Sequence, residues 1–299
     1  HPGEAKASPG YNGKESPMKR RIINLSLILV FLIGLSLLLY PSVSDWWNSM
    51  HQTRAIANYS ETIATLDHDL YDAIWRSAEE YNAALALRGT RWTLSDEELA
   101  EYNSQLNPGG TGIMGYIEIP EIKCSLPIYH GTDASVLQIA VGHIEGSSLP
   151  VGGASTHCVL SGHRGLPSAK LFTNLDQLVV GDIFMLEVLN ETLTYEVDQI
   201  LIVLPHELDA LEIEEGEDLC TLVTCTPYGV NSHRLLVRGH RVENLPEAKT
   251  VRVTAEAIQI EPLIVAPFVA LPILLLLLII LLLPKHTKKK QGGDADEDA

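Results

Sequence analysis

The stretch TLVTCTPYGVNSHRLLVRG, residues 221–239, indicates how the central part of this chain folds. It contains two runs of apolar and β-branched residues, separated by the turn-forming sequence Thr-Pro-Tyr-Gly at 226–229. Such runs around a turn predict two neighbouring antiparallel strands. In that arrangement Arg234, at the start of the second strand, returns to the level of Cys225, at the end of the first. A thiol and a guanidinium are therefore expected to meet where the strands open onto a loop, a place where reactive groups are commonly displayed.

The same β-rich pattern extends over residues 112–245. Short runs of β-branched and apolar residues recur there, punctuated by Gly and Pro, and they predict a mainly β domain, a sandwich or a closed barrel. The segment Leu171–Leu178 lies between two runs and is expected to form a short helix. The expected strands are Gly115–Ile119, Leu126–Tyr129, His157–Ser161, Asp182–Val188, Thr192–Val203, Leu219–Cys225 and Leu235–Val242.

Helices are expected before the strands. From Glu61 to Leu85 apolar residues recur every three or four positions, which is the pattern of an amphipathic helix. Ser95 followed by Glu98 has the spacing of a capping box and predicts the start of a second, short helix. Pro108 with the two glycines after it then ends the helical pattern. Residues 41–111 are thus expected to form a helical extension in front of the β domain.

Two apolar blocks flank this region of a 299-residue chain. Leu263–Leu283 has 21 residues without a charge, and as a helix it spans roughly 30 Å, the thickness of a bilayer's hydrocarbon core. Ile22–Tyr40 follows a basic start and has 19 residues. Because that run is longer than a typical signal-peptide core, it favours an uncleaved anchor over a cleaved signal. Residues 246–262 are expected to link the β domain to the second anchor.

Basic residues lie at the outer ends of both blocks, at Lys19–Arg21 and at four lysines between residues 285 and 290. By the positive-inside rule both termini are cytoplasmic and residues 41–261 are outside the cell. That exported part has 12 basic and 32 acidic side chains, a net charge of −20, which opposes binding to nucleic acid. Residues 1–21 and 284–299 are expected to be unstructured cytoplasmic ends.

The four cysteines are too few to staple an exported domain with disulfides. They form no CxxC or CxxH pair, and no metal site or cofactor is expected. Cys124, Cys158 and Cys220 are expected to be buried small apolar residues. Cys225 differs from them because it ends an apolar run immediately before a turn.

Among the 11 histidines, His163 is best placed for acid–base chemistry, because the glycine-flanked sequence SGHRG at 161–165 directly follows an apolar run. A Cys, a His and an Arg at strand ends can perform acyl transfer. The thiolate is then the nucleophile, the imidazole moves the proton, and the guanidinium holds a carbonyl oxygen. The other histidines near the strands are expected to be surface or satisfied core residues, with His233 pointing away from Arg234; they are His143, His157, His233 and His240.

These motifs resemble those of the sortases, specifically the class C or pilin-polymerising group. Residues 221–239 are similar to the sortase signature, SGHRGLPSAKLFTNLDQL at 161–178 resembles the group's histidine motif, and GIMGYIEIPEI at 112–122 resembles its first barrel strand. The resemblance implies an eight-stranded sortase β-barrel carried between two membrane anchors. It also implies that Cys225 is the nucleophile, His163 the general acid/base, and Arg234 the residue that stabilises the oxyanion or positions the sorting signal.

The resemblance further implies the reaction. Such an enzyme cleaves an LPxTG-like sorting signal through a Cys thioester and transfers the acyl group to a lysine amine of a pilin subunit. The alternatives are a sortase that attaches proteins to peptidoglycan, one that mainly hydrolyses, and a non-catalytic exported scaffold or adhesion module. A papain-like protease is disfavoured, because its Cys precedes its His in the chain and here His163 precedes Cys225.

One stretch departs from the class C pattern. Those enzymes usually carry a lid before the barrel, with an Asp-Pro-aromatic motif that covers the Cys and the Arg. The matching stretch here is RGTRWT at 88–93, in which Trp92 is the candidate aromatic and both Asp and Pro are absent. The departure predicts no standard closed lid and easier access to Cys225. Packing of Trp92 between the two helices is the alternative.

Overall fold

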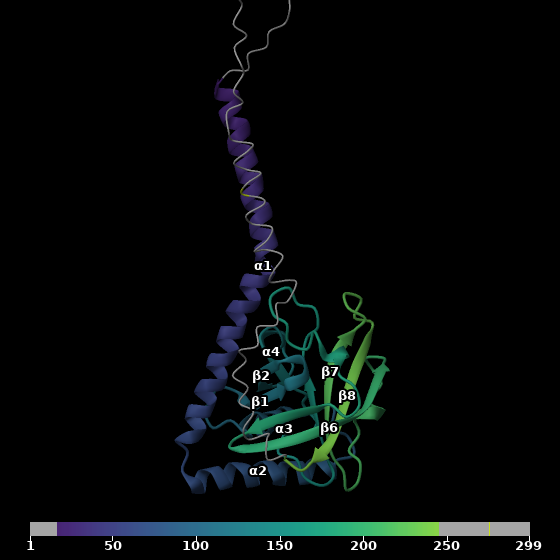
Figure 1. The fold of residues 1–299 in the computed structure, drawn as a ribbon. Coiled ribbons are helices and arrows are strands. Elements are labelled where there is room, and N and C mark those ends of the chain that lie inside the picture. The colour runs from purple at the N-terminus through teal and green to yellow at the C-terminus, as the bar shows by residue number, and fades with distance from the viewer. Residues whose placement is uncertain (1–16, 245–274, 276–299) are drawn as a thin grey trace, which may run out of the picture. The chain divides into compact units, whose positions relative to one another are not determined.

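The computed structural model describes residues 17–244 and residue 275 of the chain (Figure 1). The described residues 40–244 belong to one compact unit, and its centre is a closed β-barrel. The first half of the long helix α1 belongs to a separate unit. The apolar block Leu263–Leu283, predicted as a second membrane anchor, lies outside the described residues apart from the single residue 275.

Eight strands close the barrel in the order β1-β2-β3-β4-β7-β8-β6-β5. Closure removes the free sheet edges, and a barrel of this size is filled by its own side chains. The predicted mainly β, eight-stranded fold is confirmed, and β3 is the strand that the sequence pattern missed, because three residues are too few to show an alternation. The strands are β1 (Ile113–Ile119), β2 (Cys124–His130), β3 (Val141–His143), β4 (Thr156–Ser161), β5 (Ile183–Val188), β6 (Glu191–Val203), β7 (Asp218–Thr226) and β8 (His233–Val242).

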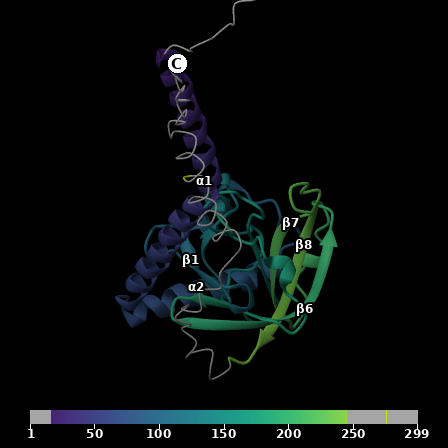
Figure 2. The ribbon, with the colours of Figure 1, turned by 45° about the horizontal axis from the view of Figure 1, so that its top comes forward.

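Strand β7 occupies the position that matters most for the site. It runs parallel to β4 on one side and antiparallel to β8 on the other. Figures 1 and 2 show β7 and β8 side by side in the barrel. The ends of β4 and β7 therefore open at the same rim of the barrel, and β8 starts at that rim.

Side chains on β7 alternate between two apolar clusters. Cys220 and Leu222 belong to the main core inside the barrel. Val223 belongs to a second cluster, called here the outer cluster, which lies on the opposite face of the strand. The outer cluster consists of Val159, Leu211, Val223 and Leu236. Both faces of β7 are thus covered along most of its length.

The region expected to be one helix from Glu61 to Leu85 is two helices, so that prediction was wrong. Helix α1 (Pro17–Ala64) ends and α2 (His68–Ala86) begins after a tight turn at residues 65–67. The N–H groups of Thr65 and Leu66 bond to carbonyls three residues back, which closes α1. The turn lets both helices bury side chains against the barrel core, Tyr59 and Ile63 from α1 and Tyr81 and Leu85 from α2.

Helix α3 (Asp96–Ser104) begins as the sequence predicts. The Ser95 hydroxyl accepts a hydrogen bond from the Glu98 N–H at 3.3 Å, and the Glu98 carboxylate accepts one from the Ser95 N–H at 2.8 Å. This is a complete capping box. The shorter helical turns are η1 (Pro120–Ile122), α4 (Ala134–Leu137), η2 (Leu175–Gln177) and η3 (Asp209–Leu211).

The helix expected at Leu171–Leu178 is reduced to η2. Leu171 has a positive φ of 40°, which a right-handed helix cannot include. The next N–H, that of Phe172, donates to the carbonyl of His163 at 3.1 Å. The conformation of the segment is therefore set by its contact with the loop after β4. Local helical propensity does not include that contact, so it predicted a helix that is too long.

Helix α1 contains the first apolar block. Its stretch Arg21–Ala64 is long and apolar enough to cross a membrane, with a mean hydropathy of 2.8 in its most apolar window, and none of that window is buried. The helix begins at Pro17, inside the segment expected to be unstructured, and continues through Pro41. Proline is tolerated inside membrane helices more readily than inside soluble ones.

Candidate active site

Cys225 and Arg234 are register partners on the antiparallel strands β7 and β8. Residues directly opposite each other in such a pair project from the same face, with Cβ atoms about 4.5–5.5 Å apart. Both residues are half-buried. The structure therefore places Cys225 and Arg234 opposite each other on neighbouring strands, in the register that the sequence predicts.

The alternation along the strands shows which face they share. Val223 precedes Cys225 by two positions and Leu236 follows Arg234 by two, and both lie in the outer cluster. Residues two apart on a strand face the same way. Cys225 and Arg234 thus continue the row of the outer cluster towards the rim of the barrel, outside the closed interior.

The loop that carries His163 starts where β4 ends. Ser161 pairs with Val223, and because β4 and β7 are parallel, His163 reaches the level of Cys225. The residue before it is fixed to β7: the Gly162 N–H donates to the Val223 carbonyl at 3.0 Å, and the Thr224 hydroxyl donates to the Gly162 carbonyl at 2.7 Å. The histidine loop is therefore tied to the two residues that precede Cys225.

The residue after His163 is tied to the other side of Cys225. Arg164 donates through Nη1 to the Thr226 hydroxyl at 3.4 Å and forms an ion pair with Asp176 through Nη2. The residues on both sides of His163 thus contact the residues on both sides of Cys225. This arrangement fixes the backbone at His163 relative to the backbone at Cys225.

Two glycines allow the histidine loop to lie this close to its neighbours. A Cβ on Gly162 would lie 2.6 Å from the ring of Phe172. A Cβ on Gly165, whose φ is +76°, would lie 2.5 Å from the ring of Tyr228 in the loop after Cys225. The sequence motif SGHRG contains glycine at these positions because a side chain would displace both neighbours.

Arg234 is held by its own loop. Its Nη1 group donates to the carbonyls of Asn231 and His233 at 3.3 and 3.1 Å. Among the described residues, none accepts a hydrogen bond from its Nη2 group. That half of the guanidinium fork is available to a carbonyl oxygen or an oxyanion near Cys225.

Trp92 packs against the outer cluster and not between the two helices, so the alternative placement was wrong. Its indole N–H donates to Glu212 at 3.3 Å, and the Arg91 guanidinium lies 4.5 Å from its ring centroid. Arg91 is itself buried and bonds to the Leu211 carbonyl and the Glu212 carboxylate at 2.9 and 2.8 Å. The stretch that matches the lid is therefore fastened to the segment around η3, on the face that Cys225 and Arg234 share.

The remaining cysteines do not join this group. Cys158 and Cys220 are register partners on β4 and β7 and are buried in the main core, as predicted. Burial raises the pKa of Cys220 well above its ordinary value. The Cys124 residue as a whole is half-buried. Its thiol donates a 3.9 Å hydrogen bond to the Leu171 carbonyl, and burial raises the pKa of this thiol to about 12.

Two of the other histidines are satisfied core residues, as predicted. His143 is fully buried and contacts the Tyr102 hydroxyl at 2.9 Å and the Ser148 carbonyl at 2.8 Å. His157 is also fully buried, with its Nδ1 2.8 Å from the Glu212 carbonyl and its Nε2 2.7 Å from the Thr221 hydroxyl. Within residues 17–244, no three His, Cys, Asp or Glu side chains gather closely enough to hold a metal ion.

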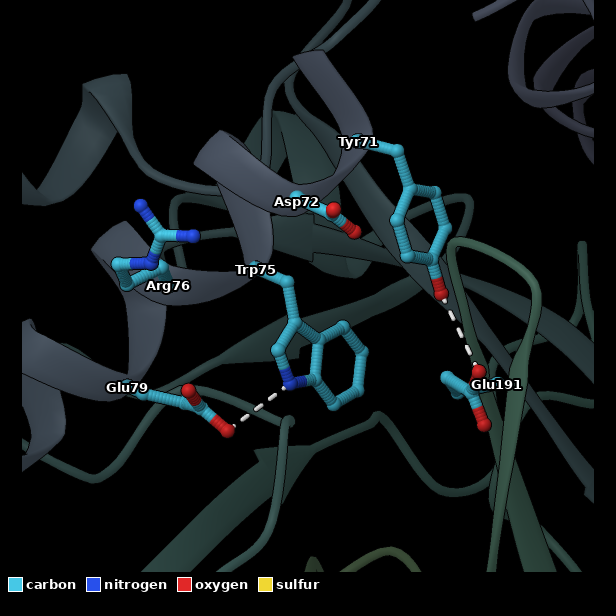
Figure 3. Close-up of a pocket in the computed structure, with 6 residues that line it drawn as sticks. All are labelled: Tyr71, Asp72, Trp75, Arg76, Glu79 and Glu191. Atoms are coloured by element: carbon cyan, nitrogen blue, oxygen red, sulfur yellow. Dashed lines mark hydrogen bonds between the residues drawn. The ribbon is translucent and has the colours of Figure 1, made fainter. Parts of the chain in front are cut away.

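A pocket of about 410 Å³ lies elsewhere, between α2 and the start of β6 (Figure 3). Two hydrogen bonds link residues that line it. The Trp75 indole N–H donates to Glu79 at 3.0 Å, and the Tyr71 hydroxyl donates to Glu191 at 3.4 Å. The pocket lies far from Arg234. Glu191 is the first residue of β6, and Val203, the last residue of that strand, is the one that pairs with Arg234. The two ends of β6 are roughly 40 Å apart at about 3.3 Å per residue. The pocket is lined by Tyr71, Asp72, Trp75, Arg76, Glu79 and Glu191, which include neither a thiol nor an imidazole.

Comparisons with known proteins agree with this geometry. The family model described as the sortase domain matches residues 117–242. Sortase D of Bacillus subtilis is 30% identical over 153 residues, which are 50% of this chain and 74% of that protein. The chain belongs to the sortase family. Sortases are cysteine transpeptidases, and the barrel is therefore the domain of an enzyme.

Several of the solved structures similar to this sortase are class C sortases. Sortase C1 from Streptococcus agalactiae is 55% identical, with a TM-score of 0.63 over 64% of this chain and 100% of that one. Sortase C of Streptococcus pneumoniae, whose structure was described in terms of catalysis and pilin substrate specificity, is 42% identical, with a TM-score of 0.58 over 64% of this chain and 97% of that one.

The residues that position the histidine loop were not found by sequence reasoning. Gly162, Arg164 and Thr224 act through hydrogen bonds between segments about 60 residues apart, as the distances above show. The glycines beside His163 were the available signal, because a glycine-flanked histidine after a strand indicates a backbone that passes close to something else.

Proposed function

We propose that this sortase is a membrane-anchored, pilin-polymerising transpeptidase in which Cys225 is the nucleophile, His163 the general acid/base and Arg234 the oxyanion-stabilising residue. The observation that supports these roles most strongly is the position of Cys225. It lies directly opposite Arg234. Its neighbours Thr224 and Thr226 are hydrogen-bonded to Gly162 and Arg164, the residues on either side of His163.

In the first half of the reaction the Cys225 thiolate attacks the carbonyl carbon between Thr and Gly of an LPxTG-like sorting signal. Negative charge develops on the carbonyl oxygen, within reach of the free half of the Arg234 guanidinium. The C–N bond then breaks, and His163 gives its proton to the departing glycine amine. The product is a thioester between Cys225 and the threonine of the substrate.

In the second half a lysine amine of another pilin subunit attacks the thioester carbonyl. His163, now neutral, takes the proton from this amine, and the Cys225 thiolate leaves. An isopeptide bond has formed, and thiolate and imidazolium are restored. Because the thioester conserves the reactivity of the acyl group, the transfer requires no nucleotide outside the cell.

The pilin assignment is supported by the class of the similar structures, and one of these was described in terms of pilin substrate specificity. The proposed location is the cell membrane, with the catalytic domain outside the cell and both termini in the cytoplasm. The apolar part of α1 and the basic residues Lys19–Arg21 before it support that orientation. Leu263–Leu283 would be the second anchor.

Trp92 is proposed to border the substrate path as a fixed element. Its anchors at Glu212 and at the outer cluster hold it on the face that carries Cys225. No Asp-Pro motif is present to close over the thiol. Trp92→Ala is therefore expected to change the KM for the sorting signal while leaving the rate of Cys225 alkylation by iodoacetamide within a few-fold of the original.

The deciding experiment is mass spectrometry of the full chain in detergent, incubated with an LPxTG-type peptide and a lysine-bearing pilin subunit. The proposal predicts an isopeptide product that Cys225→Ala abolishes, while Cys124→Ala, which changes a half-buried thiol elsewhere, retains it. Cleavage of the peptide with transfer only to water or to a peptidoglycan-type amine would refute pilin polymerisation. If none of the motifs tested forms a thioester, the result would support a non-catalytic scaffold.

A further inference from the structure

Three polar side chains along one face of α1, between residues 45 and 52, are directed at the barrel loops. The Asp45 carboxylate accepts a hydrogen bond from the Lys170 N–H at 2.9 Å. Asn48 donates to the Ser168 carbonyl at 2.8 Å, and Gln52 donates to the Ile139 carbonyl at 2.7 Å. This face of the helix is therefore specifically docked on the catalytic domain.

The opposite face of the same segment is apolar and exposed. Val43, Trp46, Trp47 and Met50 follow the spacing i, i+3, i+4, i+7, which places them in one row along a helix. Their exposed fractions are 57%, 60%, 58% and 46%. We call this row the aromatic stripe. The segment is an amphipathic helix with its polar side towards the protein and its apolar side away from it.

Such a stripe needs a partner that accepts apolar side chains. Single exposed apolar residues are common, whereas a contiguous row with two tryptophans marks a contact surface. Within the described residues only the ring of His51 stacks near it, 4.9 Å from that of Trp47. The described part of the catalytic domain does not cover the stripe.

The position of the stripe in the helix indicates what its partner is. The apolar block ends at Tyr40, and Trp46 and Trp47 follow it in the same helix, roughly 9–11 Å further along the axis. Tryptophan and tyrosine are enriched where a membrane protein leaves the hydrocarbon core, because their rings are apolar at one end and hydrogen-bond at the other. Arg54, one turn beyond Met50, is exposed and has a charge suited to phosphate headgroups.

We propose that the aromatic stripe lies in the interfacial layer of the bilayer and binds the catalytic domain to the membrane surface. The polar face of the same segment holds Ser168 and Lys170, which belong to the loop that continues from His163. The contact would therefore keep the histidine loop beside the membrane. That location suits a substrate that is itself tethered in the bilayer.

The test is depth-dependent fluorescence quenching of the full chain reconstituted in phosphatidylcholine vesicles, which needs no assumption about activity. Trp75→Phe/Trp92→Phe leaves Trp46 and Trp47 as the only tryptophans. Lipids with a spin label close to the headgroup should quench their emission strongly, lipids labelled near the chain end should quench it weakly, and aqueous acrylamide should quench it little.

The matched control is Trp46→Phe/Trp47→Phe/Trp92→Phe, which leaves only Trp75. That residue lies in the pocket on α2, and its emission should be insensitive to both lipid labels. Quenching of Trp46 and Trp47 by acrylamide alone would overturn the proposal, since the stripe would then face water. Protection from lipid labels and acrylamide together would also overturn it, because protein, either a second copy or residues 263–283, would then cover the stripe.

Discussion

The hydroxyl of Thr224 donates a 2.7 Å hydrogen bond to the carbonyl of Gly162, so the residue before Cys225 holds the residue before His163. Thr224 is buried, with 1% of its surface exposed. The two segments are distant in the chain and run in parallel here. This contact is one of three that hold the segment of the proposed general acid/base against that of the nucleophile, together with Gly162 N–H to Val223 and Arg164 to Thr226.

Thr224→Val should lower kcat of transpeptidation while the fold is retained. The substitution keeps the shape and leaves a buried carbonyl without its donor, which costs about 1–3 kcal/mol. Displacement of a catalytic group by about 1 Å can reduce the rate by roughly 100-fold. The matched control is Thr221→Val on the same strand, whose hydroxyl bonds to His157. Equal losses of kcat in both variants would mean that the Thr224 contact has no special role in positioning His163.

Gly165→Ala should also reduce activity, through two separable effects. A side chain at a φ of +76° is strained, by about 1–2 kcal/mol, and its Cβ would meet the ring of Tyr228 at 2.5 Å. Combining it with Tyr228→Ala removes the clash and leaves the strain. Partial recovery of kcat/KM in the double variant, relative to Gly165→Ala, is the expected outcome. If the double variant is no better than Gly165→Ala, contact with Tyr228 does not shape the loop.

Tyr59→Phe should destabilise the catalytic domain by about 2 kcal/mol or more. The Tyr59 hydroxyl donates to the Met114 carbonyl and accepts from the Leu189 N–H, both at 2.8 Å and both buried. Tyr71→Phe is the control, because its hydroxyl makes a 3.4 Å contact with Glu191 at the surface. Urea denaturation in detergent, followed by near-UV circular dichroism, should separate the two. Similar midpoints would show that the link between α1 and the barrel contributes little.

The stability of the domain should fall as the pH decreases below about 6.5. Burial is the main cause that lowers the pKa of His157 below its ordinary 6.5, and the nearby charges of Arg91 and Arg238 lower it further. The unfolded chain then binds more protons than the folded one below pH 6.5, so stability is fully present above that pH and is lost below it.

The effect of His157 is at most about 1.4 kcal/mol per pH unit. His157→Gln should be less stable at neutral pH and should show a shallower dependence between pH 7 and 5.5, measured by the same urea titrations. An unchanged slope would mean that another group governs this window. His130, whose pKa is also lowered by burial, is the first to examine in that case.

The sequence predicted the parts of this molecule that depend on local pattern. The seven longer strands, the capping box at Ser95 and the opposition of Cys225 and Arg234 follow from alternation and turn chemistry within about 20 residues. The resemblance to class C sortases supplied the number of strands. Local pattern did not show the break after Ala64, because the same apolar spacing continues through the turn.

The rest depends on contacts between distant segments. Segments that are distant in the sequence come into contact in the barrel, and a short sequence window does not contain both partners of such a contact. Three features arise in this way: the positive φ at Leu171, the hydrogen bond between Gly162 and Thr224, and the packing of Trp92 on the outer cluster. For the same reason the aromatic stripe was not predicted. The loops at Ile139 and Ser168 determine which face of α1 contacts the protein and which face is exposed.

The account depends most directly on the covalent step at Cys225. The measurement that tests it is intact-protein mass spectrometry of the full chain after brief exposure to LPxTG-type peptides, with peptide mapping of the adduct. The account predicts an acyl adduct on Cys225 that is absent in Cys225→Ala and that forms on the order of 100 to 1,000 times more slowly in Arg234→Ala. An adduct that persists in Cys225→Ala, or that maps to Cys124, would contradict it.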